Sequence, residues 1–332
     1  MKIGYLGAGS WGFCLASLLA NKGYRVVSWT TKPHLAKQLN ATQKHPLLPE
    51  GPKSPNLSFT TDLAEAIDGC DLLVESVTSA GIRPVFEQIK AIGVPDCPIV
   101  LTSKGIEQNS WLILPDVVIA VLGEAVRSRI GLLSGPSFAQ GVVLGLPTSV
   151  VGTAFDHAIM MEICELFTTK TFRVYPNSDI YGVAYGGALK NIVAIACGIS
   201  DGLGLGASAR AALMTRGLHE MFKLAKVRGG HSQTLSGLSG LGDLVLTCGS
   251  QTSRNFSYGY RLGKGMTPAE AEKEINMAVE GVYTCHSAWQ LSRHDNIPMP
   301  ITETVHRIIL GEVQPMDAVR LLMQRTIKEE HL

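Results

Sequence analysis

The stretch Lys2–Trp29, KIGYLGAGSWGFCLASLLANKGYRVVSW, holds two short apolar runs separated by a glycine-rich turn and a segment of helical length. Lys2–Leu6 and Tyr24–Trp29 are rich in residues that favour strands. Phe13–Asn21 predicts a helix, which Gly23 ends. A strand, a helix and a second strand in this order form a βαβ unit, and GxGxxG stands in its first turn. The stretch therefore predicts a dinucleotide-binding sheet.

Each glycine of this turn has a physical role of its own. Gly7 permits the tight turn, Gly9 lets backbone approach a pyrophosphate, and Gly12 lets the helix and strand pack closely. The N-terminus of the helix offers unpaired N–H groups and a positive dipole end to the phosphates. The alternative is a glycine-rich turn with no ligand, which the βαβ context disfavours.

The end of the second strand bears on the choice of cofactor. An acidic residue at this place binds the ribose 2′-hydroxyl in many NAD sites. Here the residues are Trp29-Thr30-Thr31-Lys32, with hydroxyls and a cation but no carboxylate. A 2′-phosphate suits such a set, so NADP is favoured over NAD or at least accepted. The alternative for Lys32 itself is a solvated loop residue.

The alternation of strands and helices continues through the first half. Further strands are predicted at 57–60, 71–77, 99–103, 130–133, 149–152 and 171–175, with helices capped by Asp62, opened by Pro84 and near 156–167. This predicts an α/β fold with an N-terminal Rossmann-like, doubly wound, mostly parallel sheet. Two strand ends carry polar turns, Ser103-Lys104-Gly105 and Ser134–Ala139, each an ordinary turn or part of a ligand site.

From about Asn177 the strand pattern stops, which predicts residues 1–177 as the dinucleotide-binding domain and 178–332 as an all-helical substrate-binding domain. Ile180–Ser200 contains one charged residue, Lys190, among small and apolar neighbours. Small residues on the lysine's side of a helix would let another molecule come close. Lys190 is then either an acid/base group in a crevice or a lysine whose ammonium reaches water.

The loops of the second half hold further polar sets. Ser236–Gly242 reads as a flexible loop leading to Asp243, and Thr247 lies four residues on, so a helix would place both on one side. Ser253-Arg254-Asn255 combines a hydroxyl, a forked cation and an amide, which suits a phosphate. Glu280 is expected in a later loop.

Bulk properties limit the function classes. The formal charge is +1 and only 17% of residues are charged, so no nucleic-acid or anionic-membrane surface is indicated. The seven cysteines and nine histidines have no ligand-like spacing, which favours reduced thiols and no metal. Ile180–Ser200 has spanning length, but Lys190, Asn191 and its glycines argue against a membrane helix. A cytoplasmic protein is expected.

Motifs along nearly the whole chain resemble those of one family. They are GAGSWG (7–12), SKGIE (103–107), LSGPSFA (133–139), GGALKNIVAIACGISDGLG (186–204), TRGLHEM (215–221), GLSGLGDLVLTC (237–248), SRN (253–255) and VEGV (279–282). In this order they resemble the NAD(P)-dependent glycerol-3-phosphate dehydrogenases. The bacterial type, which usually prefers NADP and serves phospholipid synthesis, is the better match.

The resemblance implies roles for single residues. Lys190 would be the general acid/base, and Lys104, Asp243 and Thr247 would complete the reacting centre. The substrate would contact Lys104, Gly135, Ser137, Lys190, Asp243, Ser253, Arg254 and Asn255. The cofactor would contact Ser10, Trp11, Lys104, Ala139, Arg254 and Glu280, besides the glycines and Lys32 above. NAD(P)H would deliver hydride to C2 of dihydroxyacetone phosphate, giving sn-glycerol 3-phosphate, and a homodimer is usual.

The chain departs from the family pattern at a few places. Ala184-Tyr185 stands where an acidic residue usually precedes the glycine pair, Ala207-Ser208 where Asn is common, and Val77-Thr78 for a usual Val-Pro-Ser. Asn40–Pro55 echoes the family only loosely. These changes concern substrate contacts and loop closure rather than the reaction.

Two other functions compete with this one. The first is a β-hydroxyacid or ketopantoate-type reductase of the same architecture, which would have no need of Ser253-Arg254-Asn255. The second is a catalytically inactive NADP sensor or scaffold, which would have no reason to keep Lys104, Lys190 and Asp243 together.

Overall fold

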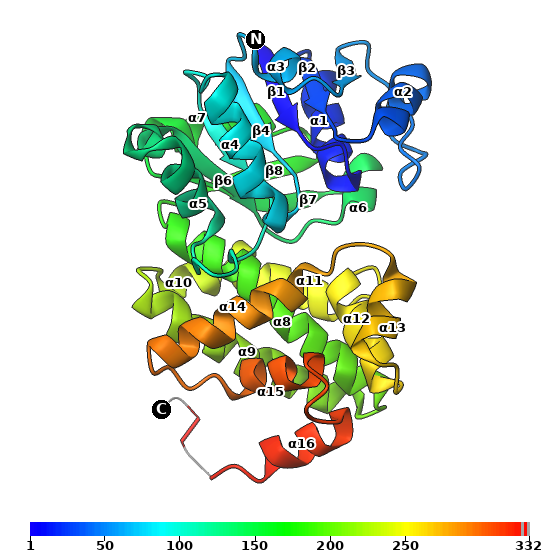
Figure 1. Ribbon diagram of the computed structural model, residues 1–332, viewed down its shortest axis with the longest axis vertical. Coiled ribbons are helices and arrows are strands. Elements are labelled where there is room, and N and C mark those ends of the chain that lie inside the picture. The colour runs from blue at the N-terminus through cyan, green and yellow to red at the C-terminus, as the bar shows by residue number, and fades with distance from the viewer. Residues whose placement is uncertain (327–328, 331–332) are drawn as a thin grey trace.

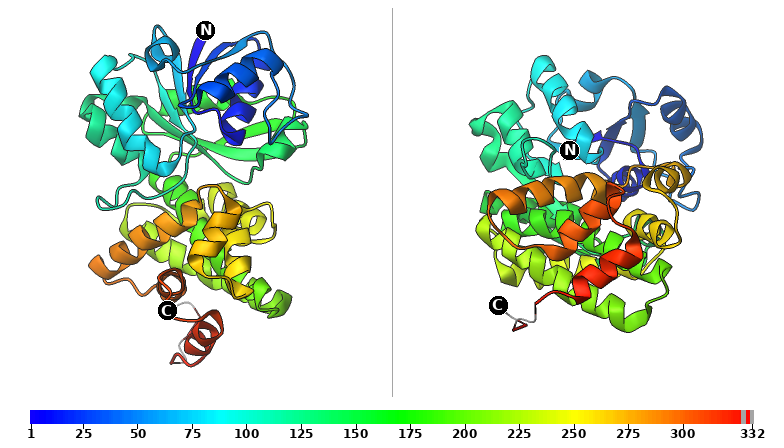
Figure 2. Two further views of the ribbon diagram at one scale, coloured as in Figure 1. Left: turned by 45° about the vertical axis from the view of Figure 1, so that its right-hand side comes forward. Right: turned by 60° about the horizontal axis from the view of Figure 1, so that its bottom comes forward.

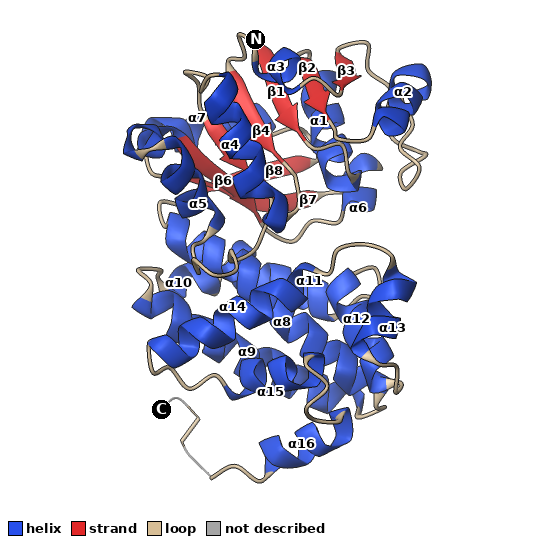
Figure 3. Ribbon diagram, in the orientation of Figure 1, coloured by secondary structure: helices blue, strands red, loops and turns tan. Residues whose placement is uncertain are grey.

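The computed structural model describes residues 1–326 and 329–330, and its two halves differ in architecture (Figure 1). The first half is a sheet with helices on both faces. All strands belong to it, and the second half is helical in its described residues (Figure 3). The segments that follow the central strands contact the helical half, so the ligand-binding edge of the sheet faces that half.

The sheet has eight strands in the order β3-β2-β1-β4-β5-β6-β7-β8, and every neighbouring pair is parallel except β6 with β7. The strands are β1 (Lys2–Leu6), β2 (Arg25–Trp29), β3 (Leu57–Thr60), β4 (Leu72–Glu75), β5 (Ile99–Leu101), β6 (Ile130–Ser134), β7 (Thr148–Ala154) and β8 (Phe172–Pro176). The chain order reverses between β1 and β4, which makes a topological switch point where ligands bind in such sheets. The predicted fold class is confirmed.

Helices cover both faces of the sheet and bury two separate hydrophobic cores. One face packs against α3 (Leu63–Ile67), α4 (Ile82–Ile92) and α5 (Leu114–Leu122), and the other against α1 (Ser10–Asn21), α2 (Pro33–Thr42) and α7 (His157–Phe167). Shorter pieces are η1 (Ser79–Gly81), η2 (Glu124–Arg129) and α6 (Ala139–Val143). Asp62 caps α3 as predicted, since its carboxylate accepts hydrogen bonds from the first amides of that helix.

The second half is built around α8 (Ile180–Gly202), drawn in green, and the yellow and orange helices of this half pack against it (Figure 2). Its other helices are α9 (Gly206–Val227), α10 (Ser232–Leu235), η3 (Leu238–Gly242), α11 (Asp243–Cys248), α12 (Arg254–Gly263), α13 (Pro268–Ile275), α14 (Glu280–His294), α15 (Pro300–Ile309) and α16 (Pro315–Met323). By length and composition α8 could cross a membrane, but its apolar stretch is wholly buried in the protein. It is a core helix of this half.

We propose the domain boundary at 177/178, between β8 and α8.

Four glycines let α8 and α12 cross with their backbones in contact. A Cβ atom on Gly198 or Gly259 would lie 2.0 Å from a carbonyl oxygen of the other helix. Gly202 and Gly263 repeat the arrangement one turn on, with 2.4 Å to the facing carbonyl oxygens. Only glycine fits at such a crossing, because any side chain would overlap the opposing backbone.

Several elements differ from the sequence prediction. Glu280 is the first residue of α14, where a loop was expected. Residues 236–242 are not a flexible loop, because η3 winds as a π-helical turn into α11 with Ser239 and Gly240 buried. Glycine-rich composition indicated mobility, whereas close packing is what these glycines serve: a Cβ on Gly240 would lie 2.0 Å from the Leu235 carbonyl oxygen. Helices α2, α5 and α6 were not predicted.

The α8–α12 crossing gives a stability prediction. Replacing an exposed or unhindered glycine in a helix by alanine raises the free energy of unfolding by about 1 kcal/mol. For Gly198→Ala and Gly259→Ala we expect instead a loss of about 2 kcal/mol or more in the free energy of unfolding, because the methyl group forces the helices apart. Denaturant unfolding measures both.

The control is Gly141→Ala in α6, where the nearest atom to a new Cβ is 3.9 Å away, and no loss is expected. Equal stability of Gly259→Ala and the parent would contradict the backbone contact.

Candidate active site

The glycine turn between β1 and α1 is shaped as a dinucleotide site requires. Gly7 has φ +105°, and a Cβ there would lie 2.6 Å from the carbonyl oxygen of Ser76. A Cβ on Gly12 would lie 2.2 Å from the carbonyl oxygen of Gly7. Gly9 is exposed with nothing within 4 Å of its Cβ position, so the turn is open on the side of the first α1 amides. These residues fit a pyrophosphate.

Other predicted cofactor contacts lie around this turn. Ser10 and Trp11 form the half-buried first turn of α1. Ala139 opens α6 beside α1, and its carbonyl oxygen accepts a hydrogen bond from the Cys14 thiol. Lys32 is exposed at the end of β2, directly before the first turn of α2. The structure therefore brings these positions to one edge of the sheet.

A buried carboxylate joins the predicted reacting groups. Asp243, the first residue of α11, pairs through Oδ1 with Lys190 of α8 and through Oδ2 with Lys104 at 2.5 Å. Lys190 Nζ also donates to Thr247 Oγ1 at 2.8 Å, and Lys104 Nζ donates to the Gly135 carbonyl oxygen at 3.3 Å. The spacing of Asp243 and Thr247 was correctly predicted to turn both toward one side. Two ammonium groups and one carboxylate leave an excess positive charge.

The electrostatics of this cluster follow from its burial. Asp243 is 1% exposed and Lys190 7%. Burial lowers the pKa of Lys190 to about 8; the Asp243 carboxylate opposes this effect and the Lys104 ammonium adds to it. Burial acts to raise the pKa of Asp243, but the two ammonium groups outweigh it and hold that pKa below its usual range. Near neutral pH, Lys190 is a protonated acid that can release its proton.

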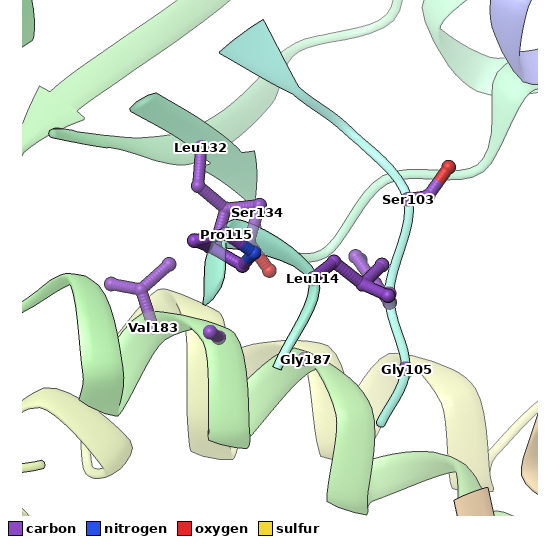
Figure 4. Close-up of a pocket in the computed structure, with 10 residues that line it drawn as sticks. Ser103, Gly105, Leu114, Pro115, Leu132, Ser134, Val183 and Gly187 are labelled. Atoms are coloured by element: carbon purple, nitrogen blue, oxygen red, sulfur yellow. The ribbon is translucent and has the colours of Figure 1, made fainter. Parts of the chain in front are cut away.

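The side of α8 that carries the small residues next to Lys190 is covered by other parts of the chain. The sequence had predicted that this side would be open to another molecule. A Cβ on Gly187 would lie 2.8 Å from Ser134 Oγ and 3.4 Å from the Lys104 side chain. The glycines thus let Lys104 cross the helix to reach Asp243. Beside them is a cavity of about 10 Å³, lined by Ser103, Lys104, Leu132, Ser134, Val183 and Gly187 (Figure 4).

The predicted phosphate set lies at the start of α12, and each of its three side chains makes at least one hydrogen bond within the protein. Ser253 caps the helix by accepting from the Phe256 amide. Asn255 donates to Asn191 Oδ1 and accepts from the Gly281 amide, both at 2.9 Å. Arg254 is exposed and uses one nitrogen on the Ala278 carbonyl oxygen.

Glu280 joins the two halves of the chain. Its carboxylate accepts hydrogen bonds from the Ser79 amide, at 3.2 Å, and from the Ser79 hydroxyl. It therefore lies next to η1, which follows β4 at the sheet edge. Ser137 stays near the cluster, since its hydroxyl donates to the Gly135 carbonyl oxygen at 3.2 Å.

Sequence reasoning missed Asn191 and Ser79. Asn191 directly follows Lys190 and carries the bond to Asn255, so its position in the helix was a usable signal. Ser79 lies 201 residues from Glu280, and nothing local to either residue marks the pair. Among the described residues, no group of three or more His, Cys, Asp or Glu side chains could hold a metal ion.

The fold and the site define an NAD(P)-dependent oxidoreductase. The family description "NAD-dependent glycerol-3-phosphate dehydrogenase" matches twice, its N-terminal part over residues 2–159 and its C-terminal part over residues 179–320. The chain belongs to this family.

Known proteins of this family match the chain over nearly its full length. The chain is 61% identical to "Glycerol-3-phosphate dehydrogenase [NAD(P)+]" of Protochlamydia amoebophila, covering 100% of this chain and 99% of that protein. Identity to the protein of the same name from Chlamydia pneumoniae is 54%, covering 99% of each. A crystal structure of glycerol-3-phosphate dehydrogenase from Coxiella burnetii is 39% identical with a TM-score of 0.92, covering 98% of this chain and 99% of the other.

The charge cluster gives a pH-dependent stability prediction. Asp243→Asn leaves the buried Lys190 ammonium and the half-buried Lys104 ammonium without their counter-ion, which costs about 3–5 kcal/mol of unfolding free energy. The pKa of Lys190 then falls further, so in the variant this lysine releases its proton at a lower pH than in the parent. A depressed lysine pKa means that stability rises with pH above that pKa. The deficit should therefore shrink as pH rises from 6 to 8 and stay constant above.

Denaturant unfolding at several pH values measures this deficit. Asp317→Asn, at an exposed ion pair with Arg320, is the control and should change stability by less than about 0.5 kcal/mol at every pH. A deficit for Asp243→Asn that does not vary with pH would contradict the linkage to Lys190.

Proposed function

We propose that this chain catalyses the reversible reduction of dihydroxyacetone phosphate to sn-glycerol 3-phosphate with NAD(P)H. The observation that carries the proposal is the convergence of Lys104, Lys190 and Asp243 beside the dinucleotide turn. Lys104 follows β5, whose neighbour β4 leads into the Ser76 carbonyl that contacts Gly7. An acid and a second cation therefore stand close to the place of the cofactor.

In the reduction, Lys190 donates a proton to the alkoxide that develops at C2 of the substrate. Lys104 stabilises the same negative charge, and Asp243 holds both ammonium groups in place. Thr247 fixes the Lys190 ammonium from the other side. NAD(P)H bound at the glycine turn supplies the hydride. A lysine pKa near 8 suits both directions, because the group gives and takes a proton close to neutral pH.

We further propose that the substrate phosphate binds at the start of α12. Arg254 offers the free part of its guanidinium there, and the first amides of the ten-residue helix add their dipole. Ser253 and Asn255 hold this helix start in position. Gly135 and Ser137 line the opposite side of the substrate site. Asn191 links the phosphate set to the neighbour of Lys190.

The choice of nucleotide and the cellular setting also belong to this proposal. We infer a preference for NADP, because Thr30 and Lys32 stand at the end of β2 where a carboxylate would repel a 2′-phosphate. Ser10, Trp11, Ala139 and Glu280 complete the cofactor contacts. We propose a cytoplasmic homodimer that supplies glycerol phosphate for phospholipid synthesis.

The first experiment measures initial rates of NADPH and of NADH oxidation with dihydroxyacetone phosphate and with dihydroxyacetone. We expect turnover with the phosphate ester only, and a higher kcat/KM with NADPH. If the enzyme instead reduces unphosphorylated keto acids and not dihydroxyacetone phosphate, a reductase of the ketopantoate type is favoured.

A second prediction concerns the proton donor. With the parent enzyme, kcat/KM for reduction should fall as pH rises through about 8, because the protonated form of Lys190 is lost. Lys190→Met should lower kcat by about 10²–10⁴-fold and remove this alkaline limb, with NADPH binding retained. Rates and fluorescence titration of NADPH measure the two effects.

Arg254→Ala is the matched control. It should raise KM for dihydroxyacetone phosphate while the limb near pH 8 persists. Unchanged pH dependence in Lys190→Met would assign the proton to another group.

A further inference from the structure

Glu75 is a fully buried carboxyl group that forms no ion pair with any of the described residues. It ends β4, pairs in register with Leu6 and Leu101, and is 0% exposed. Its Oε1 accepts hydrogen bonds from the Val77 amide and from Ser103 Oγ, the latter at 2.7 Å. Its Oε2 is buried without a hydrogen-bond partner in the described part of the chain. A polar group in such a place is costly, so its presence needs a reason.

The two groups that Glu75 binds belong to two neighbouring segments of the site, one following β4 and the other following β5. Val77 stands against the dinucleotide turn, since its nitrogen would be 3.2 Å from a Cβ on Gly7. Ser103 directly precedes Lys104, which reaches Asp243. Ser103 Oγ also donates to the Val77 carbonyl oxygen at 2.5 Å. One carboxyl group thus fixes the spacing between the cofactor turn and the Lys104 segment.

Hydroxyl groups on the other face of the sheet brace the same strand ends. Tyr5, Ser76 and Thr102 form a chain of contacts at 2.7 and 2.5 Å across β1, β4 and β5. Thr102 Oγ1 also donates to the Glu75 carbonyl oxygen at 2.8 Å. The hydrogen bonds of Tyr5, Ser76 and Thr102 link the ends of the strands, whereas the Glu75 side chain links the segments that follow the strands.

We propose that Glu75 is a positioning residue of the dehydrogenase, acting through Ser103 on Lys104 and through Val77 on the cofactor turn. This inference rests on the proposed function, in which Lys104 stabilises the developing alkoxide. Glu75 itself touches neither substrate nor cofactor. Its effect on the reaction is therefore indirect, through the placement of groups that do.

The charge state of Glu75 fits this role. Burial raises its pKa to about 8, while its hydrogen bonds act in the opposite direction. At neutral pH the group is an uncharged acid, so glutamine is a close match in shape and charge, and the amide oxygen can accept both hydrogen bonds. Valine suits a strand but offers no acceptor.

The test compares Glu75→Gln, Glu75→Val and Ser103→Ala in steady-state reduction of dihydroxyacetone phosphate by NADPH. Glu75→Gln should keep kcat within about twofold of the parent. Glu75→Val should lower kcat at least tenfold and raise KM for NADPH several-fold, because both segments lose their anchor. Ser103→Ala should lower kcat but leave KM for NADPH within about twofold, since Glu75 still holds the Val77 amide.

A double variant separates positioning from general weakening. If Glu75 acts on Lys104 through Ser103, Glu75→Val with Ser103→Ala should have a kcat within about twofold of Glu75→Val alone. Independent effects would multiply instead. Multiplied effects, or a kcat of Glu75→Val equal to the parent, would overturn the proposal. If Glu75→Val does not fold, an unchanged kcat in Ser103→Ala overturns it alone.

Glu220 provides the matched control. It is also buried, and its carboxyl group binds the amides of Ile301 and Thr302 between α9 and α15, within the helical half. Glu220→Val should lower stability yet keep kcat and KM well below its melting temperature. A loss of kcat there equal to that of Glu75→Val would make the Glu75 effect merely structural. A parent enzyme inactive on dihydroxyacetone phosphate would defeat the proposed function instead.

Discussion

One buried carboxylate, that of Asp243, holds two ammonium groups that come from different halves of the chain. Lys104 follows a strand of the sheet, and Lys190 lies in the central helix of the second half. The buried Lys190 ammonium is not stable in such a place alone, because an unpaired buried charge costs several kcal/mol, and the half-buried Lys104 shares the same counter-ion. The sheet edge and the helical half must therefore meet at one spacing. The surplus positive charge at this junction is available to an anionic substrate.

The packing of α8 places the rest of the site relative to this junction. Its crossing with α12 is set by backbone contact through glycines, which leaves less freedom than contact through flexible side chains. The same crossing fixes the start of α12, where Arg254 lies, and Asn255 ties that start to Asn191. Hydride transfer needs the substrate carbon held to within a fraction of an ångström. A rigid link between Lys190 and the proposed phosphate site meets that need.

The sequence predicted what depends on local pattern. The βαβ unit, the glycine turn and the spacing of Asp243 and Thr247 follow from residue order alone. Contacts between residues far apart in the sequence could not be predicted in this way. Glu280 was expected in a loop, and its hydrogen bond with Ser79 depends on how the two halves of the chain meet. Glycines 237, 240 and 242 indicated mobility because composition does not distinguish a free turn from a packed one. Glu75 lies in a strand that the sequence predicted, but it was not recognised there, because only the fold supplies Val77 and Ser103 as its partners.

The two buried carboxyl groups of the active-site region show why these partners matter. Asp243 and Glu75 are both shielded from water, yet their pKa values move in opposite directions. Lysines surround the first and keep it charged, whereas burial outweighs the hydrogen bonds of the second and favours its neutral form. A negative charge at Glu75 would lie near the glycine turn at which we propose the cofactor phosphates bind, and would oppose them. A neutral acid avoids this repulsion and still accepts the hydrogen bonds from the Val77 amide and the Ser103 hydroxyl.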